Sequence, residues 1–170
     1  MIAPEIKTPR LVLEPLRRAF KQHVQWLNNK TLMQFSEQRH REHNGLTQAK
    51  YVTLAIASDT HMSWNIRTGD HQTIGTITAQ FDLPNSTVDL GLMIGRPFER
   101  QGYGAEAYGF VTDWLLEHKC HKVEGGTMEH NIGMIAIFTK CGFQIEGRRI
   151  HHFFYNGKRA DMFYFGKFAS

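Results

Sequence analysis

The 170-residue sequence predicts one α+β domain with a mixed, mostly antiparallel sheet of about seven strands and about four helices against it. Segments with apolar residues at every second position indicate the strands, and three of these follow one another as a meander. Four other segments repeat apolar residues at helical spacing. The chain has no internal repeat or Pro/Gly/Ser-rich linker, and a domain typically has roughly 150 residues, so residues 1–170 are expected to form a single domain.

The composition is that of a soluble globular protein, because 41% of the residues are hydrophobic and 21% are charged. No apolar run approaches the roughly 18–20 residues that a membrane-spanning helix needs, and residues 1–10 lack the apolar centre of a secretory signal. Cys120 and Cys141 form no CxxC pair, so neither a disulfide framework nor a structural zinc site is indicated. We therefore expect a cytoplasmic protein with reduced thiols and no membrane partner.

The formal net charge of +4 is mildly basic and is spread along the chain. Such a charge weakly favours an anionic ligand. A protein that reads nucleic acid more often carries a clustered basic stripe and a recognisable binding module, and the sequence shows neither. A nucleic-acid partner is therefore not predicted.

The N-terminal third is expected to contain one strand and two helices. Residues 10–15 (RLVLEP) alternate and stop at a proline, which indicates a strand. Residues 19–28 and 47–58 carry apolar residues three and four positions apart, which indicates helices. The polar stretch 34–44 (QFSEQRHREHN) predicts neither element, so we expect it to lie at the surface.

The middle of the chain predicts an antiparallel meander. Residues 62–66, 73–81 and 87–94 each follow a period of two. The turn-forming sequences Thr68-Gly69-Asp70 and Pro84-Asn85-Ser86 separate them.

Two further helices are then expected around a short strand at 122–128. The first covers residues 104–117, and the second covers residues 131–141 and ends at Gly142, a typical residue after a helix C-terminus.

The end of the chain predicts a β-hairpin. Residues 143–155 and 159–168 flank Asn156-Gly157, the strongest short-range signal for a hairpin turn. In the first of these strands, His151, Phe153 and Tyr155 are expected on one face, with His152 and Phe154 on the other. Core packing is the simplest explanation of such a row.

A glycine-rich loop leads directly into the helix at 104–117. Gly102 and Gly104 let the backbone approach closely and adopt positive φ, so that amide N–H groups and the helix N-terminus converge on an anion such as phosphate. Arg100 adds a positive charge. A helix N-terminus without a ligand would explain the same glycines, so the rest of the chain must decide between the two explanations.

The same loop also matches a dinucleotide-binding fingerprint, Gly102-x-Gly104-x-x-Ala107, with Glu124 about 20 residues further on. That fingerprint should follow its strand immediately within parallel βαβ units. Here seven residues separate Gly95 from Gly102 after an antiparallel meander. The context therefore argues against a nicotinamide oxidoreductase, and the absence of Gly-Lys-Ser/Thr excludes a mononucleotide P-loop.

Together, the order of elements and their residues resemble the GNAT superfamily of acetyl-CoA dependent N-acetyltransferases, closest to the branch of ribosomal-protein N-terminal alanine acetyltransferases. The resemblance extends over nearly the whole chain. Its motifs are Thr8–Leu13 (TPRLVL), Leu90–Gly95 (LGLMIG) with Gln101–Ala107 (QGYGAEA), Asn131 through Lys140–Phe143 (KCGF) with Glu146-Gly147, and Asn156–Asp161 (NGKRAD). Each motif alone is weak, but four of them in this order and spacing are specific.

The resemblance implies a GNAT fold and an acyltransferase that moves acetyl from acetyl-CoA to a primary amine by direct attack in a ternary complex, without an acyl-enzyme. The acceptor would be an amino sugar, another small amine or a protein N-terminus, and a homodimer is one implied assembly. In such proteins the pyrophosphate lies on the loop amides and the pantetheine arm adds like a strand to residues 92–94. The implied cofactor-binding residues are Leu92, Met93, Ile94, Arg100, Gln101, Gly102, Tyr103, Gly104, Ala105, Asn131, Phe138 and Lys140.

The resemblance also implies that the strands at 87–94 and 122–128 splay apart, and that a backbone N–H near Met93 or Ile94 polarises the thioester carbonyl. An alkyl amine with a pKa near 10.4 is mostly protonated at neutral pH, so a base or water relay is expected. The candidate catalytic residues are Asp89, Glu124 and Tyr155, with Glu129 and His130 as further candidates for the base. A surface acid for Asp89 and an ion-pair partner for Glu124 are the ordinary alternatives.

One departure from the family pattern concerns the general acid. Many members carry a tyrosine four residues before the glycine of the Gly-Phe pair, and it protonates the departing thiolate; here that residue is Phe138. Water, Tyr103 or Tyr155 could replace it, because a thiol with a pKa near 8.5 is a tolerable leaving group. The departure keeps open a second interpretation, a catalytically silent GNAT-fold module that binds coenzyme A.

The acceptor pocket of the family is walled by the closing hairpin and by the region between the first two helices. The acceptor-site candidates are Trp26, Phe35, Arg39, His40 and His151, together with Tyr155. Aromatic and histidine side chains would suit an amino sugar or a peptide terminus equally. His40-Arg41-Glu42-His43 has no further ligand at a recognised spacing, so no metal site is predicted.

Overall fold

The computed structural model describes residues 1–169 and confirms an α+β fold, with eight strands in place of the expected seven or so. The strands are β1 (Ile6–Lys7), β2 (Leu11–Pro15), β3 (His61–Thr68), β4 (Thr73–Asp82), β5 (Thr87–Ile94), β6 (Lys122–Met128), β7 (Gln144–Tyr155) and β8 (Lys158–Phe168). The helices are α1 (Lys21–Leu27), α2 (Gly45–Ala57), α3 (Tyr103–His118) and α4 (Ile132–Lys140), with the 3₁₀ helices η1 (Glu37–His40) and η2 (Arg96–Phe98). The additional strand is β1, which has two residues.

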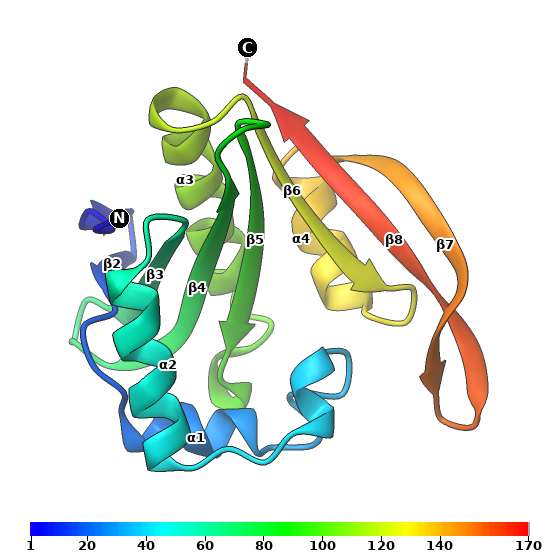
Figure 1. Cartoon of the computed structure of the whole chain (residues 1–170), viewed down its shortest axis with the longest axis horizontal. Helices are drawn as coiled ribbons and strands as arrows, with labels where there is room; N and C mark the ends of the chain where they lie inside the picture. The colour runs from blue at the N-terminus through cyan, green and yellow to red at the C-terminus, as the bar shows by residue number, and fades with distance from the viewer. Residues whose placement is uncertain (170) are drawn as a thin grey trace.

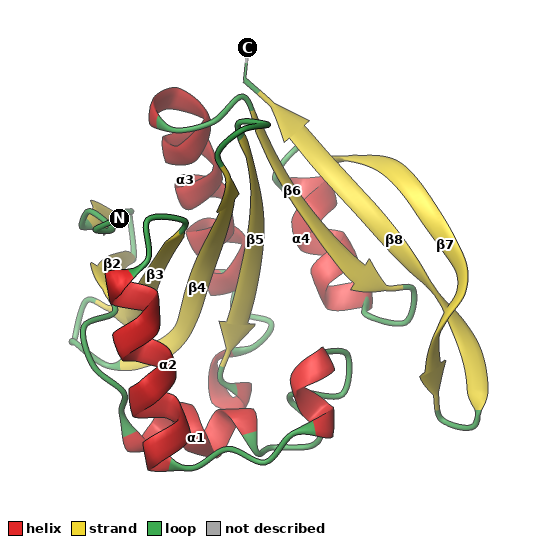
Figure 2. Ribbon diagram, viewed as in Figure 1, coloured by secondary structure: helices red, strands yellow, loops and turns green. Residues whose placement is uncertain are grey.

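All eight strands form one sheet in the order β1-β2-β3-β4-β5-β6-β8-β7. The predicted meander is confirmed, because β3, β4 and β5 pair antiparallel in sequence order. In Figure 1, α3 and α4 lie behind the sheet and α2 crosses in front of it, while α1 lies at the lower end of β5. We call the two sides the α3/α4 face and the α1/α2 face; Figure 2 shows the same layers by element type.

The parallel pair in the sheet, β5 with β6, separates soon after it begins. Its register runs through Thr87↔Lys122 and Val88↔Val123 to Asp89↔Glu124 and then stops. Beyond that point β5 stays paired with β4 as far as Ile94, and β6 stays paired with β8 as far as Met128. We call the facing strand segments, Leu90–Ile94 and Gly125–Met128, the splayed edge, and they diverge toward the lower part of Figure 1.

The core lies between the sheet and α3. The fully buried side chains include Tyr108, Val111 and Leu115 of α3, which pack against Val88 and Leu90 of β5. These residues carry the helical and strand periodicities that predicted the two elements. Cys120 is buried and Cys141 is half-buried, both as free thiols. No helix within residues 1–169 combines the length and the apolar character needed to cross a lipid bilayer.

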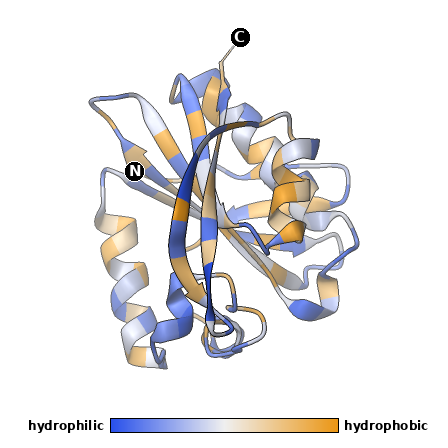
Figure 3. Cartoon of the chain, turned by 90° about the vertical axis from the view of Figure 1, so that its right-hand side faces the viewer, coloured by the Kyte–Doolittle hydropathy of each residue, from blue (hydrophilic) through white to orange (hydrophobic). Residues whose placement is uncertain are grey.

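The closing hairpin confirms its predicted turn, since Asn156 and Gly157 adopt φ of 50° and 76°, as a type I′ turn requires. The outer strand β7 is not regular. Its register with β8 slips between Arg149 and Phe153, where His151 adopts φ of 54°. In Figure 3 the hairpin runs down the front of the molecule, with hydrophilic and hydrophobic residues interspersed along both strands. It forms one end of the sheet and leaves the outer edge of β7 unpaired among the described strands.

The polar stretch at 34–44 lies at the surface, as expected, and contains η1. After it, α2 begins at Gly45, two residues before the predicted start. The reason is a capping box: the Asn44 side chain accepts from Thr47 N at 2.9 Å, and Thr47 Oγ1 accepts from Asn44 N at 3.0 Å. Reciprocal bonds of this kind satisfy N–H groups that the first helical turn leaves free.

Candidate functional site

The connection from β5 to α3 leaves a set of backbone N–H groups without intrahelical partners. Arg100 and Gly102 adopt φ of 60° and 81°, and Gly102 is the N-cap of α3. A glycine offers no side chain to cap the helix, so the first N–H groups of α3, beginning at Tyr103, are not satisfied from within the helix. Amides at a helix N-terminus bind anions, because the helix dipole adds to their partial charges. The predicted anion-binding loop therefore has the required backbone geometry.

Gly104 brings α3 close to both β5 and α4. A Cβ atom at this position would lie 3.1 Å from Ile137 Cδ1 and 3.3 Å from Leu92 Cδ2. Larger residues would push the helix N-terminus away from the end of β5. The second glycine of the loop is thus required by packing, whereas Gly102 is required by its left-handed backbone.

A brace from the N-terminal segment holds this loop in place, which the sequence analysis did not anticipate. Arg10 Nε lies 2.6 Å from Glu106 Oε2, Arg10 Nη1 donates to Gln101 O at 3.0 Å, and the guanidinium lies 4.7 Å from the centre of the Tyr103 ring. Thr8 Oγ1 donates to Glu106 Oε1 at 2.6 Å. Two segments almost 100 residues apart in sequence are therefore joined at the first turn of α3.

The Glu106 carboxylate at the centre of this brace is strongly held. Desolvation opposes its ionisation, but the hydrogen bonds from Thr8 and Arg10 and the Arg10 charge outweigh that effect, so the pKa of Glu106 lies below its usual value. An ionised Glu106 in the first turn of α3 is also favoured by the helix dipole. The motif Thr8-Pro9-Arg10 was visible in the sequence, but its contact with Glu106 required the fold.

The splayed edge exposes the backbone of alternate β5 residues. Gly95 N donates to Ile74 O at 2.8 Å, so the N–H of Gly95 points toward β4. Because the direction of backbone groups alternates along an antiparallel strand, the N–H of Met93 also points toward β4, while those of Leu92 and Ile94 point toward the splayed edge. Of the two N–H groups predicted to polarise a carbonyl, the geometry favours Ile94 over Met93.

Tyr108 holds the point at which the strands part. Its hydroxyl donates to Leu90 O at 3.0 Å, the first β5 carbonyl beyond the β6 pairing. Desolvation above all, with the nearby Asp89 carboxylate and the Cys141 thiol, raises the pKa of Tyr108 well above its usual value, so the hydroxyl keeps its proton. Across from it, a Cβ on Gly125 would lie 3.0 Å from both Tyr108 Oη and Phe138 Cζ. A glycine is therefore needed where β6 leaves β5.

Of the two strand acids, Asp89 and Glu124, only Glu124 has an ion-pair partner within residues 1–169. Lys122 Nζ lies 2.9 Å from Glu124 Oε2 and 2.6 Å from Glu146 Oε2. Asp89, its register partner, retains solvent exposure at the start of the splayed edge. Partial desolvation, followed by repulsion from Glu124, raises the pKa of Asp89. Asp89 thus combines an unpaired carboxylate with a basicity above the ordinary value.

Phe138 and Asn131 occupy different surroundings, although both were predicted to contact the cofactor. Phe138 is 1% exposed, stacks on Phe165 at 4.3 Å between ring centres, and lies beneath Gly125 on the α3/α4 face. Asn131 caps α4, with its Oδ1 accepting from Met134 N at 3.2 Å and its Nδ2 donating to Thr127 Oγ1. It therefore ties the end of β6 to the start of α4. Lys140 is exposed in the last turn of that helix.

Several of the predicted acceptor-site residues come together on the α1/α2 face. Tyr155 Oη donates to Gln34 Oε1 at 2.9 Å, and the Tyr155 ring lies 5.5 Å from that of Phe35 and 5.4 Å from that of His130. The Arg39 guanidinium lies 5.7 Å from the centre of the Phe153 ring. The surface stretch before α2 and the hairpin therefore meet side by side. Gln34 and Phe153 were missing from the predicted set.

The remaining acceptor candidates lie apart from this group. Trp26 is buried against Gly95, where a Cβ would come within 2.9 Å of the indole ring. His40 is exposed at the end of η1. His151 is exposed in the β7 irregularity, where its N–H donates to Asp161 Oδ1 at 2.7 Å. The predicted alternation that put His151 beside Phe153 and Tyr155 fails there, because the extra residues of the bulge break the two-residue period.

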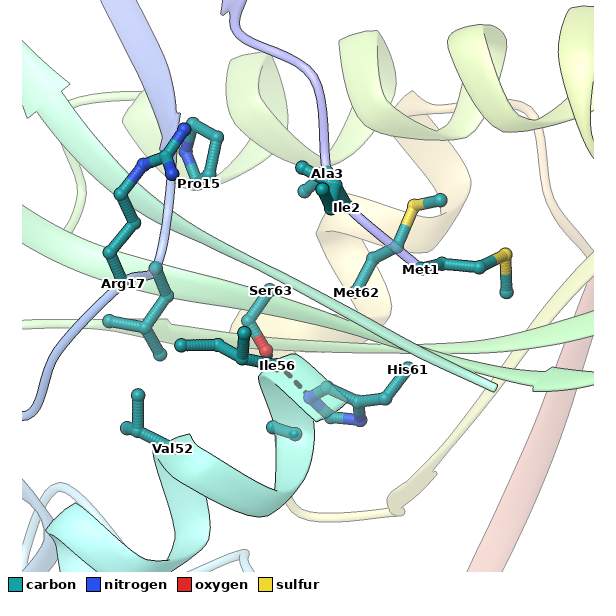
Figure 4. A pocket seen from close by; sticks show the side chains of 12 residues that line it. Met1, Ile2, Ala3, Pro15, Arg17, Val52, Ile56, His61, Met62 and Ser63 are labelled. Carbon is teal, nitrogen blue, oxygen red and sulfur yellow. Dashed lines mark hydrogen bonds between the residues drawn. The ribbon is translucent and has the colours of Figure 1, made fainter. Parts of the chain in front are cut away.

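A separate apolar pocket of about 280 Å³ lies between the N-terminal residues, α2 and the start of β3. Figure 4 shows Val52 and Ile56 on α2, Met62 directed toward Ala3 and Met1, and His61 bonded to Ser63. The sheet order places β3 two strands away from β5. This pocket is therefore distinct from the splayed edge.

Comparisons with known proteins agree with this geometry. The model of the acetyltransferase (GNAT) domain family matches residues 10–144. The probable N-acetyltransferase YjcK of Bacillus subtilis is 30% identical over 81 residues, and the match covers 46% of this chain and 45% of that protein, so less than half of that relative is spanned.

Two solved structures show the same fold over almost the whole chain. Spermidine N-acetyltransferase from Vibrio cholerae, in complex with CoA and spermine, has a TM-score of 0.82 at 16% identity and covers 95% of this chain and 97% of its own. The ribosomal L7/L12 α-N-protein acetyltransferase RimL, in complex with coenzyme A, has a TM-score of 0.81 at 17% identity and covers 99% and 98%. The expected GNAT fold is confirmed by these likenesses.

Proposed function

The chain belongs to the acetyltransferase (GNAT) domain family, and on that premise we propose that it transfers an acetyl group from acetyl-CoA to a primary amine. One observation carries the proposal: the anion-binding loop before α3 and the unpaired backbone of β5 adjoin each other. A ligand that is anionic at one end and amide-bearing along its arm fits both features. Coenzyme A has this chemistry.

The loop and the splayed edge would divide the binding of acetyl-CoA between them. The N–H groups of residues 103–105 would bind the pyrophosphate, with Arg100 adding positive charge. Leu92 and Ile94 would pair with the amides of the pantetheine arm, as an added strand pairs with a sheet edge. The ion pair between Arg10 and Glu106 would hold the loop in a fixed position relative to that edge.

Asp89 is the residue we propose for the proton of the amine. Its carboxylate would accept that proton through a chain of water molecules as the amine nitrogen attacks the thioester carbon, because five strand residues, roughly 17 Å, separate Asp89 from Ile94. The new C–N bond forms, the C–S bond breaks, and coenzyme A departs as a thiolate that takes a proton from solvent. The N–H of Ile94 would stabilise the negative charge that develops on the carbonyl oxygen. The Lys122 ion pair makes Glu124 a weaker candidate for the base.

The buried environment of Phe138 favours a second candidate function, a module that binds coenzyme A without catalysis. Phe138 offers no proton, and the hydroxyl of Tyr108 is engaged by Leu90 O. A thiolate leaving group near pKa 8.5 does not demand a general acid, so acetyl transfer remains our first proposal.

The test of the proposal is a thermal-shift titration with acetyl-CoA, coenzyme A, NAD and NADP, followed by thiol release with a panel of amines. A ligand at 100 times its Kd adds about 2.7 kcal/mol to the stability of the folded state, which is a readily measured shift. We expect stabilisation by both forms of coenzyme A and thiol release with at least one amine. Stabilisation without thiol release would support the silent module, and a larger response to a dinucleotide would contradict both proposals.

A further inference from the structure

A guanidinium without an acidic partner lies on the α1/α2 face beside the splayed edge. Arg149 of β7 has its Cζ atom 4.9 Å from the centre of the Tyr164 ring, and the register pairs Tyr164 with Gly126 of the splayed edge. No carboxylate among residues 1–169 forms an ion pair with Arg149, and its side chain is exposed. Stacking on an aromatic ring positions the guanidinium while its N–H groups stay free for a ligand.

The neighbouring arginine, Arg148, differs from Arg149 because a carboxylate neutralises its charge. Arg148 points to the opposite face, where its guanidinium forms an ion pair with Asp161, a carboxylate that is 3% exposed. That Asp161 carboxylate also accepts from the N–H of His151 and so holds the β7 irregularity. Arg148 therefore has a structural partner, whereas Arg149 has a ring beneath it and solvent above.

A second arginine of this wall, Arg39, already has a carboxylate partner in Glu37. Arg39 lies over Phe153, where its Nη1 donates to Ser36 O at 2.8 Å and lies 3.5 Å from Glu37, which is largely exposed. The acids of the hairpin, Glu146 and Asp161, are both engaged, Glu146 by Lys122 and Asp161 by Arg148. At the hairpin end of the α1/α2 face an anion would therefore meet the unpaired Arg149 guanidinium, whereas the unpaired Asp89 carboxylate lies on β5 at the start of the splayed edge.

Resting on the acetyl transfer proposed above, we infer that the amine acceptor carries a phosphate or carboxylate that binds Arg149. Two strand spacings separate β6 from β7 across β8, which is about 10 Å. The acceptor would place its amine at the splayed edge and its anion about two strands away. A guanidinium binds phosphate and carboxylate through paired N–H groups, and such charge-assisted bonds are the strong ones.

The same arrangement disfavours polycationic acceptors. An acceptor with ammonium groups at both ends would bring its second charge beside Arg149, and like charges placed together weaken binding. Among the similar folds, one enzyme acts on spermidine, so this inference separates the present chain from that neighbour.

The inference is tested with three acceptors of matched length: 6-aminohexyl phosphate, 6-amino-1-hexanol and 1,6-diaminohexane. We expect kcat/KM to fall in that order, with the phosphate ahead of the alcohol by at least tenfold, because bonds to charged groups contribute about 1.5–3 kcal/mol. Equal values for the phosphate and the alcohol, or a preference for the diamine, would overturn the anion site. Release of thiol by none of the amines, despite binding of acetyl-CoA, would instead count against acetyl transfer itself.

Substitutions of Arg149 and Arg159 test whether the proposed anion site is at Arg149. Arg149→Gln should reduce kcat/KM for the phosphate about tenfold or more and leave the alcohol within a factor of about two, whereas Arg149→Lys should retain part of the preference. Arg159→Gln is the matched control, because Arg159 lies 5.7 Å from the ring of Phe154 in the same hairpin but on the opposite face. Loss of the preference in Arg159→Gln, or its survival in Arg149→Gln, would contradict the assignment.

A pair of peptides distinguishes the two sources of the anion. Peptides that begin Ala-Glu and Ala-Gln differ by one carboxylate near the N-terminal amine. A preference for Ala-Glu that disappears in Arg149→Gln would assign the site to an acidic protein N-terminus. Indifference to this pair, with the phosphate preference intact, would assign it to a small phosphorylated amine.

Discussion

The α3 side and the hairpin side of the splayed edge are built from different kinds of atoms. On the α3 side, the groups that we propose to bind acetyl-CoA are backbone amides, set by the left-handed Gly102, the close packing at Gly104 and the parting of β5 from β6. On the hairpin side, the candidate groups for the acceptor are side chains such as the exposed Arg149 and the half-buried Tyr155, carried by the outermost strand of the sheet.

This difference explains what a shared fold does and does not specify. Backbone geometry is dictated by the fold, and a chain with 16% identity to a neighbour solved in complex with CoA keeps the same fold. Side chains on an edge strand can change with little effect on stability, since surface substitutions usually alter it by less than about 0.5 kcal/mol. The donor site is therefore expected to be common to the family, and the acceptor site to be particular to this chain.

The largest predicted loss of function comes from a change in the loop before α3, where backbone amides are proposed to bind acetyl-CoA. Gly102→Glu places a side chain on a residue with φ of 81° and a negative charge at the N-terminus of α3. The strain of a non-glycine residue there costs about 1–3 kcal/mol, and repulsion of phosphate adds to it. We expect the Kd for acetyl-CoA, measured by calorimetry, to rise at least about 100-fold, with roughly 2.7 kcal/mol of binding lost.

Gly102→Ala separates the two causes, because it introduces the strain without the charge. Its affinity should lie between those of the wild type and the glutamate variant. Unchanged affinity in Gly102→Glu would mean that the anion-binding loop lies elsewhere in the chain.

The next largest predicted effect concerns the Asp89 carboxylate, at the start of the splayed edge. Asp89→Asn should lower kcat by about 100-fold while leaving the Kd for acetyl-CoA unchanged, because general base catalysis typically contributes 10²–10⁴-fold. Glu124→Gln is the control, since the Glu124 carboxylate is paired with Lys122, and it should change kcat by less than about threefold. Stopped assays of thiol release measure both. A larger loss in Glu124→Gln would exchange the two roles.

The pH dependence gives an independent reading of the same residue. The base must be ionised, so kcat should rise with pH through the pKa of Asp89, and ionisation of the amine itself, with a pKa near 10.4, should give a second rise at higher pH. Desolvation and Glu124 raise the pKa of Asp89, so the first rise should lie above the ordinary value for aspartate of about 3.9. In Glu124→Gln the repulsion is removed, and the first rise should move to lower pH. A profile that is identical in the two proteins would contradict the coupling.

The elements and the backbone geometry of the loop before α3 could be predicted from the sequence because each is specified by local signals. Asn156-Gly157 predicts its turn, and the period of two at 87–94 predicts β5 with the bounds that the structure shows. The donor loop has its own signal in Gly102 and Gly104. Such features depend on the conformational limits of a few neighbouring residues.

The contacts between distant segments could not be predicted in the same way. The bond from Tyr108 to Leu90 and the brace from Arg10 to Glu106 join segments whose spacing is set only by the folded sheet. The bulge in β7 misled the alternation argument for His151, because extra residues in one strand shift every later side chain relative to those before it. The alternation argument therefore failed for His151, whose position depends on the bulge.

The Arg10 brace offers a smaller and more selective perturbation of the donor half. Arg10→Gln removes the ion pair with Glu106 and the stacking on Tyr103 but leaves the loop amides in place. We expect about a tenfold weaker affinity for coenzyme A, or about 1.4 kcal/mol. Pantetheine lacks the pyrophosphate, so its affinity should not change. Equal weakening of both ligands would show that the brace supports the whole fold and not the loop.

The smallest predicted effect is on stability and concerns the point where the two halves part. Tyr108→Phe removes the hydroxyl that binds Leu90 O, and β6 cannot replace it because the strands have already separated there. A buried carbonyl left without a partner costs about 1–3 kcal/mol, so the free energy of unfolding in urea should fall by that amount. Tyr51→Phe is the control, since the Tyr51 hydroxyl is bonded to His61 at an exposed position, and it should cost less than about 0.5 kcal/mol. If Tyr108→Phe keeps full stability but loses affinity for acetyl-CoA, then the hydroxyl binds the ligand and Leu90 needs no partner. The point where β5 and β6 part would then bind the ligand through a side chain, as the hairpin side does.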